Sequence, residues 1–231
     1  IALAPANENQ ILPEAKRSKE AGITLVLIDS KLSEDIADCT VSTDNYEAGR
    51  ELGEYALSIC SPEEKIGIVS HVKGSSTAKE REKGVQKVLE EDGREIVQTV
   101  YGESNYSIAY DETKKMLKAH PEITVIIGTN EYATVGAARL IKDMGLKEKV
   151  KIVGFDNSKE EIQMLESGLI EGLVIQRAFD MGYLGIKIGM ETEKGKKYET
   201  YVDSGCKLVT RETIYTKENQ KLLFPVYTGD K

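Results

Sequence analysis

The feature that most constrains this chain is a regular alternation of short apolar runs with amphipathic stretches of helical length. The run at 23–28 (ITLVLI) is almost continuously apolar, which is typical of a strand buried on both faces of a parallel sheet. Such runs predict strands over 23–28, 66–70, 96–101, 124–128, 150–155 and 172–175. The intervening stretches predict helices over 10–21, 45–59, 77–91, 107–119, 132–144, 159–167 and 179–193.

This β–α alternation predicts parallel sheets that are covered by helices on both faces. At least six such units are present, which is too many for one small sheet and is compatible with two lobes. Residues 198–215 add two short strands with no long helix between them. Gly49 and Gly53 lie four residues apart on one helix face, where they would allow close packing, and Thr77 with Glu80 predicts a capping box.

The composition excludes several classes of partner. The 231 residues carry a formal charge of −8, which argues against nucleic acid as the main partner and against polybasic binding to a membrane surface. The longest apolar runs have the length of strands, so no membrane-spanning segment is predicted. Acidic proteins of this kind mostly bind small molecules or other proteins.

No motif in the chain predicts catalysis, a metal site or a cofactor. Phosphate-binding, dinucleotide-binding, zinc-protease and calcium-binding motifs are all absent from the sequence. His71 lies near Ser70, Ser75 and Ser76, but no nucleophile elbow accompanies it, so we interpret this pairing as chance. The three cysteines are widely spaced; three buried free thiols are expected, and one disulfide such as Cys39–Cys60 is the alternative.

Polar side chains that could bind a ligand follow the ends of the predicted strands. In open parallel sheets, ligands bind outside the carboxyl ends of the strands. The candidate ligand-binding residues at or beyond these ends are Asp29, Arg81, Tyr106, Asn130, Asp156 and Gln176. Carboxylates, amides and a guanidinium with nearly cancelling charges suit an uncharged, polyhydroxylated ligand.

Most of these residues also have a purely structural interpretation. Asp29 and Asp156 could be turn formers or helix caps, because Asp is favoured at both positions. Gln176 follows apolar strand residues and could bond to neighbouring backbone. Tyr106 could cover an edge of the core, which is commoner than stacking on a ligand.

Four segments, in order along the chain, resemble those of a known family. They are 41–50 (VSTDNYEAGR), 74–81 (GSSTAKER), 128–131 (GTNE) and 153–156 (VGFD). Together they resemble the type I periplasmic sugar-binding proteins, and most closely the ribose-binding branch of ABC-transporter receptors. The resemblance implies two doubly wound parallel-sheet lobes joined by a three-strand hinge. The N-terminal lobe would comprise 1–43 plus 177–203, and the C-terminal lobe 44–176 plus 204–231.

The resemblance also implies a function. A monosaccharide or similar polyol would be captured between the lobes and delivered to an ABC permease, with no enzymatic activity and no cofactor. By motif position, Asp29, Arg81, Asn130, Asp156 and Gln176 would contact the sugar, and Tyr106 would stack on its ring. The protein would be periplasmic or extracellular and would touch a membrane only through a lipid anchor, if it has one.

The chain departs from the family pattern at three places. Ser30 stands where relatives often have Arg, and Glu131 where they commonly have Asp, and both bear on which sugar is bound. The two leading βα units of the family have no counterpart here. We therefore expect a fragment or proteolysed product whose N-terminal lobe has an exposed apolar edge. The alternative is a chain that recruits strands from a partner.

Two other functions share this fold. One is the effector-sensing domain of a transcription regulator of the lac-repressor type, and the other is the sensor ectodomain of a signalling receptor. The segment 202–210 (VDSGCKLVT) looks more like the transport receptors. Upstream residues would discriminate the three functions. A signal peptide with a lipobox would indicate the transport receptor, DNA-binding helices the regulator, and a transmembrane helix the sensor.

Overall fold

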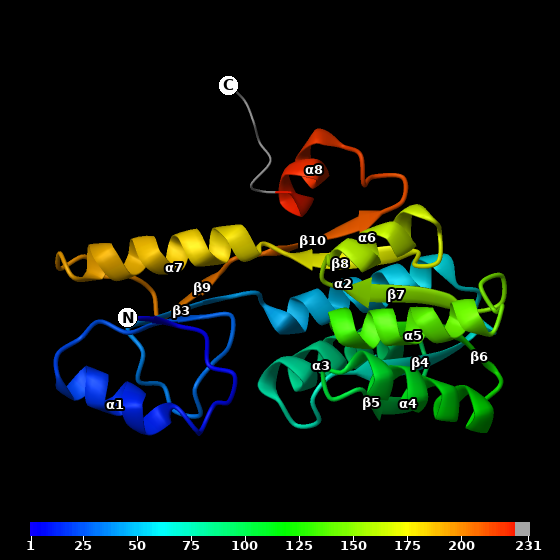
Figure 1. Ribbon diagram of the computed structural model, residues 1–231, viewed down its shortest axis with the longest axis horizontal. Coiled ribbons are helices and arrows are strands. Elements are labelled where there is room, and N and C mark those ends of the chain that lie inside the picture. The colour runs from blue at the N-terminus through cyan, green and yellow to red at the C-terminus, as the bar shows by residue number, and fades with distance from the viewer. Residues whose placement is uncertain (225–231) are drawn as a thin grey trace. The chain divides into compact units, whose positions relative to one another are not determined.

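The computed structural model describes residues 1–224, and they form two compact units (Figure 1). Unit 1 comprises Ile1–Asp44 and Gln176–Cys206, and unit 2 comprises Asn45–Ile175 and the chain from Lys207 onward. The polypeptide therefore passes from one unit to the other at three places along its sequence. The end of the expected C-terminal lobe, 225–231, lies outside the described residues.

Unit 1 is a four-stranded parallel sheet with a helix on each face. Its strand order is β1-β2-β3-β9, and the strands are β1 (Ala2–Leu3), β2 (Val26–Ile28), β3 (Cys39–Ser42) and β9 (Tyr201–Asp203). Leu25 and Leu27 pack with helix α1 (Leu12–Glu20), whereas Val26 packs with helix α7 (Ala178–Thr192). This confirms that the run is covered on both faces at Leu25, Val26 and Leu27. The strand is shorter than expected, however, and Ile23 at the start of the run is 40% exposed.

Helix α7 has a second apolar face. Met181 and Ile188 are buried against the sheet. A row at helical spacing on the rest of the helix is more than half exposed and consists of Phe179, Tyr183, Ile186 and Met190. Apolar surface is thus exposed in unit 1, as we expected, but it lies on a helix as well as at the edge strand β1, where Ile1 is exposed.

Unit 2 is a six-stranded sheet in the order β10-β8-β7-β6-β4-β5. The strands are β4 (Lys65–Ser70), β5 (Ile96–Tyr101), β6 (Ile123–Gly128), β7 (Lys151–Phe155), β8 (Gly172–Gln176) and β10 (Cys206–Thr210). The pairs from β5 across to β8 are parallel.

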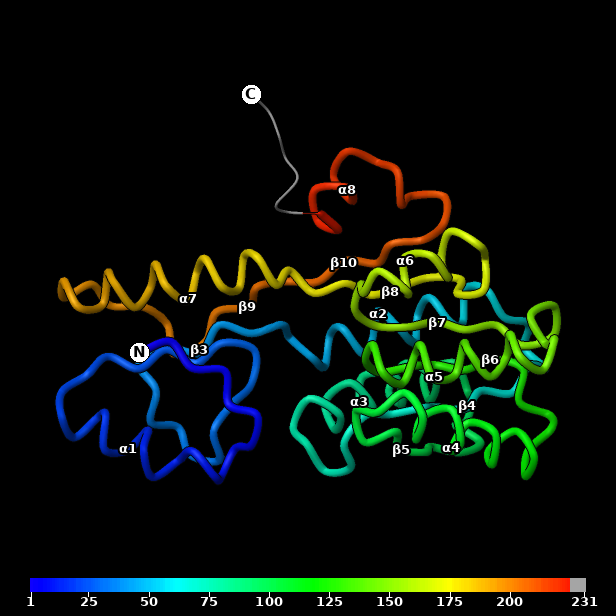
Figure 2. The backbone as a smooth tube through the Cα atoms, in the orientation of Figure 1, coloured from blue at the N-terminus to red at the C-terminus, as the bar shows by residue number. Residues whose placement is uncertain are grey.

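Helices cover both faces of the unit 2 sheet, which makes it doubly wound. They are α2 (Asn45–Ile59), α3 (Ser76–Glu91), α4 (Tyr106–Ala119), α5 (Glu131–Asp143), α6 (Lys159–Glu166) and α8 (Lys217–Leu223). Helix α2 packs with α3 over one face, and α4 packs with α5 over the other (Figure 2). The α/β class expected from the sequence is confirmed.

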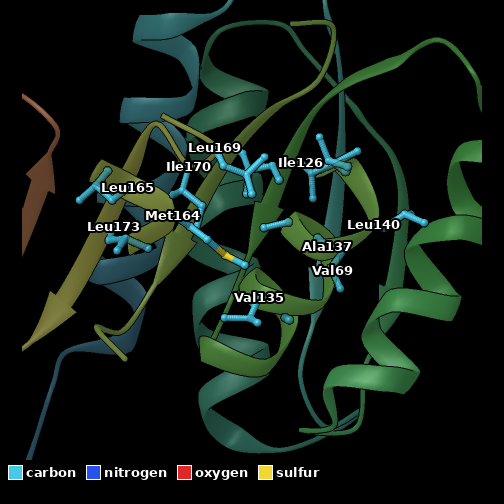
Figure 3. Close-up of a cluster of buried hydrophobic side chains, with 14 of the residues drawn as sticks. Val69, Ile126, Val135, Ala137, Leu140, Met164, Leu165, Leu169, Ile170 and Leu173 are labelled. Carbon is cyan, nitrogen blue, oxygen red and sulfur yellow. The ribbon is translucent and has the colours of Figure 1, made fainter. Parts of the chain in front are cut away.

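The main core of unit 2 lies between its sheet and α5 and α6. Figure 3 shows Val135, Ala137 and Leu140 of α5 beside Val69 of β4 and Ile126 of β6. Residues of α6, of the turn after it and of β8 complete the labelled cluster, namely Met164, Leu165, Leu169, Ile170 and Leu173. These side chains are at most 8% exposed, so the ends of the strands extend from a closely packed core.

Close packing of α2 against α3 depends on glycine. A Cβ atom added at Gly49 would lie 2.2 Å from the backbone oxygen of Arg81, and one at Gly84 would lie 2.1 Å from that of Tyr46. Gly53 also faces α3. The expected role of Gly49 and Gly53 is confirmed, and the crossing holds the backbone of Arg81 against α2.

Some local expectations were wrong. The N-cap of α3 is Ser75, whose side chain accepts from the Ala78 N–H, so Thr77 is not a cap. The strand β3 and the helix α8 were not predicted. All three cysteines are free thiols, which excludes the Cys39–Cys60 disulfide, but only Cys39 is buried as expected, whereas Cys60 and Cys206 are partly exposed. Within residues 1–224, no helix combines the length and apolar character needed to cross a membrane.

Candidate ligand-binding site

Two candidate aspartates adopt the same unusual backbone conformation. Asp29 follows β2 and Asp156 follows β7, and their φ angles are +68° and +80°. Residues other than glycine rarely adopt this left-handed conformation, and such strain tends to persist at functional sites. Neither residue is a helix N-cap, because Ser158 is the N-cap of α6 and no helix begins near Asp29.

In unit 1, the backbone of Asp29 is fixed by its neighbours. Its N–H donates to the Val41 oxygen at 2.9 Å, and its carbonyl accepts from the Ser42 hydroxyl at 2.6 Å. The Ser30 hydroxyl donates to Asp29 Oδ2 at 3.0 Å. The backbone is therefore held at both sides of a half-buried carboxylate that remains accessible.

Gln176 is the last residue of β8 and belongs to unit 1. Its Oε1 atom accepts from the Thr43 hydroxyl at 3.0 Å. The carbonyl of its amide is thus bonded to a side chain. This contact fixes the orientation of the amide, and the side chain is only partly buried.

In unit 2, Arg81 is a buried cation with a fixed geometry. Only 4% of its surface is exposed. Its Nε donates to Asn45 Oδ1 at 2.8 Å, and one terminal nitrogen donates to the Thr129 carbonyl at 2.7 Å. The guanidinium stacks on the Phe155 ring at 3.6 Å. A cation buried to this extent is costly unless partners hold it, so these contacts lock one rotamer in place.

The segment 129–131 joins three of the candidate residues. Arg81 bonds to the carbonyl of Thr129, and the N–H of Glu131 donates to Asp156 Oδ2 at 3.0 Å. Asn130 lies between them and caps α5, since its Oδ1 accepts from the Ala133 N–H at 2.9 Å. The Asn130 amide nitrogen points the other way, toward the Ser104 hydroxyl at 3.4 Å. The structure therefore brings Arg81, Asn130 and Asp156 together at one end of the unit 2 sheet.

Tyr106 begins α4 and contacts α5. Its ring packs on Tyr132 with a centroid separation of 4.6 Å, and Arg139 lies 4.8 Å from its centroid. Its hydroxyl donates to Glu131, and this hydrogen bond together with burial raises the pKa of Tyr106. Tyr106 also packs against the edge of the main core. These contacts link Tyr106 to the 129–131 segment through Glu131.

The surroundings of His71 do not form a Ser–His pair. Its ring nitrogens lie 3.0 Å from the Thr129 hydroxyl and 2.9 Å from the Thr77 hydroxyl. Burial, aided by the Arg81 charge, lowers the pKa of His71 to about 3. His71 is therefore a neutral core residue that supports the base of the site. In the part of the chain that the structure describes, no cluster of His, Cys, Asp or Glu could hold a metal ion.

Sequence reasoning missed the residues that hold the candidates in place. Asn45, Thr129 and Phe155 fix Arg81, and Thr43 fixes Gln176. Ser104 and the preceding Glu103 both have φ near +48°, which marks the loop before α4 as a second strained segment. The segments that resemble the family contain Thr43, Asn45, Thr129 and Phe155, but the resemblance did not predict their contacts.

Comparison with known proteins supports a single family. A model described as "Periplasmic binding protein domain" matches residues 1–197. The D-ribose/D-allose-binding protein of Pseudomonas aeruginosa is 25% identical over 205 residues, which is 86% of this chain. The chain spans 64% of the length of that relative.

Solved structures lead to the same family. A sugar transporter from Clostridium phytofermentans is 42% identical to this chain, with a TM-score of 0.82. The match covers 91% of this chain and 76% of the transporter chain. An ABC-transporter solute-binding protein from Agrobacterium vitis with bound D-fucose is 29% identical, with a TM-score of 0.90. The match covers 96% of this chain and 78% of that protein's chain. The expected resemblance is confirmed, and the chain belongs to the periplasmic binding protein family, among its type I sugar-binding members.

Proposed function

We propose that the protein is a solute-binding receptor that captures a monosaccharide or similar polyol between its two units and delivers it to an ABC-type importer. The two units would be the two lobes of such a receptor, although Gln176, which was expected in the C-terminal lobe, belongs to unit 1. The protein would act in the periplasm or outside the cell. It would perform no catalysis.

The observation that carries this proposal is the pair of strained aspartates. Asp29 and Asp156 follow strands in different units, and each holds a left-handed backbone that neighbouring bonds fix. Strain of this kind costs about 1–3 kcal/mol and persists only where the surroundings enforce it. Two carboxylates placed in this way can each accept hydrogen bonds from two ligand hydroxyls.

The remaining groups complement these acceptors. Arg81 supplies donors from a guanidinium that cannot lose its proton, and the Asn130 amide supplies further donors. Gln176, oriented by Thr43, adds an amide. We propose that these side chains contact the ligand and that Tyr106 borders it. An uncharged ligand with several hydroxyls fits this mixture of donors and acceptors.

Thermal unfolding in the presence of pentoses, hexoses and related polyols tests the proposal. Ligand at one hundred times its Kd stabilises a protein by about 2.7 kcal/mol. For a protein of this size we expect the unfolding midpoint to rise by about 5–10 °C with one or two sugars. A panel that leaves the midpoint unchanged would refute a sugar receptor and favour a different effector.

A further inference from the structure

Glu161 is a completely buried acid close to the candidate site. It lies in the first turn of α6 and has no exposed surface. Its Oε2 atom accepts from the Ser158 N–H at 2.8 Å, and its own N–H donates to the Ser158 hydroxyl at 3.3 Å. The other carboxyl oxygen, Oε1, is buried without a hydrogen-bond partner. A buried carboxylate with one unsatisfied oxygen is costly, so the site favours the uncharged acid.

The groups that face Glu161 add to this preference. Two carboxylates disfavour the charged form of Glu161, namely those of Asp156, after β7, and Glu131, on α5. Tyr106 of α4 also interacts electrostatically with Glu161. Arg139 of α5 is bound to the adjacent residue Glu160 through two hydrogen bonds of 2.8 and 2.6 Å. Burial first, and then the Asp156 charge, raises the pKa of Glu161 to about 9. Glu161 is therefore uncharged at neutral pH.

Glu161 also holds one end of the turn that contains Asp156. At the start of this turn, Asp156 accepts from the Glu131 N–H. Two residues later, the Ser158 N–H donates to Glu161. The Asp156 N–H also donates to the Val174 oxygen at 3.0 Å, so left-handed Asp156 lies between these contacts and the Ser158 anchor. Loss of the Ser158 anchor would free the backbone on the C-terminal side of this strained residue.

We propose that Glu161 is a positioning residue for ligand binding: its uncharged, buried carboxyl fixes the 156–158 turn so that Asp156 meets the ligand, and its ionisation switches binding off at alkaline pH. This inference rests on the proposed function, since it assigns Asp156 to the ligand. An ionised Glu161 would place a second negative charge beside Asp156 in a site that solvates it poorly. The side chain would turn toward water, the Ser158 anchor would break, and Asp156 would lose its orientation.

Ligand affinity measured between pH 6 and pH 10 tests this role. The probe is whichever monosaccharide stabilises the wild type most in the panel described above. Affinity of the wild type should fall about tenfold by pH 10, because about a tenth of the molecules then keep Glu161 protonated. The variant Glu161→Gln keeps an uncharged acceptor for the Ser158 N–H and should bind equally well from pH 6 to pH 10.

The neighbouring Glu160 provides a matched control. It lies one residue earlier on α6 and is partly exposed, and the Arg139 guanidinium lowers its pKa. Glu160→Gln should keep the alkaline loss of affinity seen in the wild type. If Glu161→Gln loses affinity at pH 10 as the wild type does, the proposal is overturned while the proposed function stands.

A measurement without ligand separates the two hypotheses. A carboxyl of this kind ordinarily has a pKa near 4.5, so between pH 4.5 and pH 9 the folded protein keeps a proton that the unfolded chain has released. The stability that Glu161 contributes is complete below pH 4.5 and is lost progressively up to pH 9. The unfolding midpoint of Glu161→Gln should therefore rise relative to wild type across this range.

The outcomes are distinct. Equal midpoint differences at pH 5 and pH 9 would show that Glu161 does not titrate in this window and would overturn the proposal alone. If no sugar binds the wild type at any pH, the proposed function fails and the positioning role fails with it, even where the midpoints shift as expected.

Discussion

At the scale of single residues, the candidate site is built from groups whose conformations are fixed before any ligand arrives. Arg81 is held by Asn45, Thr129 and Phe155, and Asp156 by the Glu131 N–H. Preorganised groups bind more tightly because less side-chain freedom is lost on binding. This fixation costs folding stability where the backbone is strained.

The strain at Asp29 leads to a testable trade-off. Glycine adopts a φ of +68° without steric cost, so Asp29→Gly should leave the free energy of unfolding unchanged or raise it by up to about 1 kcal/mol. Sugar binding should be lost, since the carboxylate is gone. Denaturant unfolding and a binding titration measure the two effects. A variant that binds sugar normally would remove Asp29 from the site.

Much of the residue-level assignment follows from position along the chain. The sequence predicts where strands end, and in a parallel sheet these ends meet at one edge, so Arg81, Asn130 and Asp156 could be grouped in advance. The residues that hold Arg81 in place could not be predicted, because Thr129 acts through its backbone carbonyl and Phe155 through the face of its ring. Both residues lie in segments that resemble the family, but neither contact can be predicted from the residue type. The burial of Glu161 was equally hidden, since a Glu in the first turn of a helix normally lies in water.

At the scale of elements, apolar runs and capping residues predicted most helices and strands closely. The helix expected over 45–59 begins and ends at Asn45 and Ile59. Strand β3 was missed because its residues, CTVS, include two polar side chains and form no continuous apolar run. The cap of α3 was misplaced because Ser75, Ser76 and Thr77 are three successive capping candidates.

The crossing of α2 and α3 leads to a second prediction. Gly84→Ala should lower the free energy of unfolding by about 3 kcal/mol, because its methyl group would collide with the Tyr46 backbone oxygen. Denaturant unfolding measures this loss.

Gly182→Ala is the control for this prediction. A Cβ at Gly182, on α7, meets no atom within 4 Å, so alanine should raise the free energy of unfolding by about 0.5–1 kcal/mol through helix propensity alone. Equal effects at the two positions would show that the crossing is not tightly packed.

At the scale of the whole molecule, the polypeptide passes three times between two units that each have their own sheet and core. The sequence predicted two lobes from the number of β–α units. It also predicted exposed apolar surface in the first lobe, although not that helix α7 would carry much of it. That face consists of Phe179, Tyr183, Ile186 and Met190.

Closure of the two units on a ligand leads to a third prediction. If the segments between the units act as a hinge, saturation with sugar should compact the protein by favouring a closed state. Small-angle X-ray scattering should then show a smaller radius of gyration with the bound sugar than without it, and no change with a sugar that does not bind. An unchanged radius at saturation would contradict the hinged mechanism while leaving sugar binding intact.

The most direct test of the central claim is a calorimetric titration of the wild type and Asp156→Asn with the sugar that stabilises the protein most. Asparagine adopts the left-handed backbone as readily as aspartate and can still accept from the Glu131 N–H, so this variant should fold. We predict one sugar per chain for the wild type and at least about 30-fold weaker binding for Asp156→Asn, with Asp143→Asn, an exposed change on α5, as the unaffected control. Equal affinity of Asp156→Asn and wild type would contradict the account.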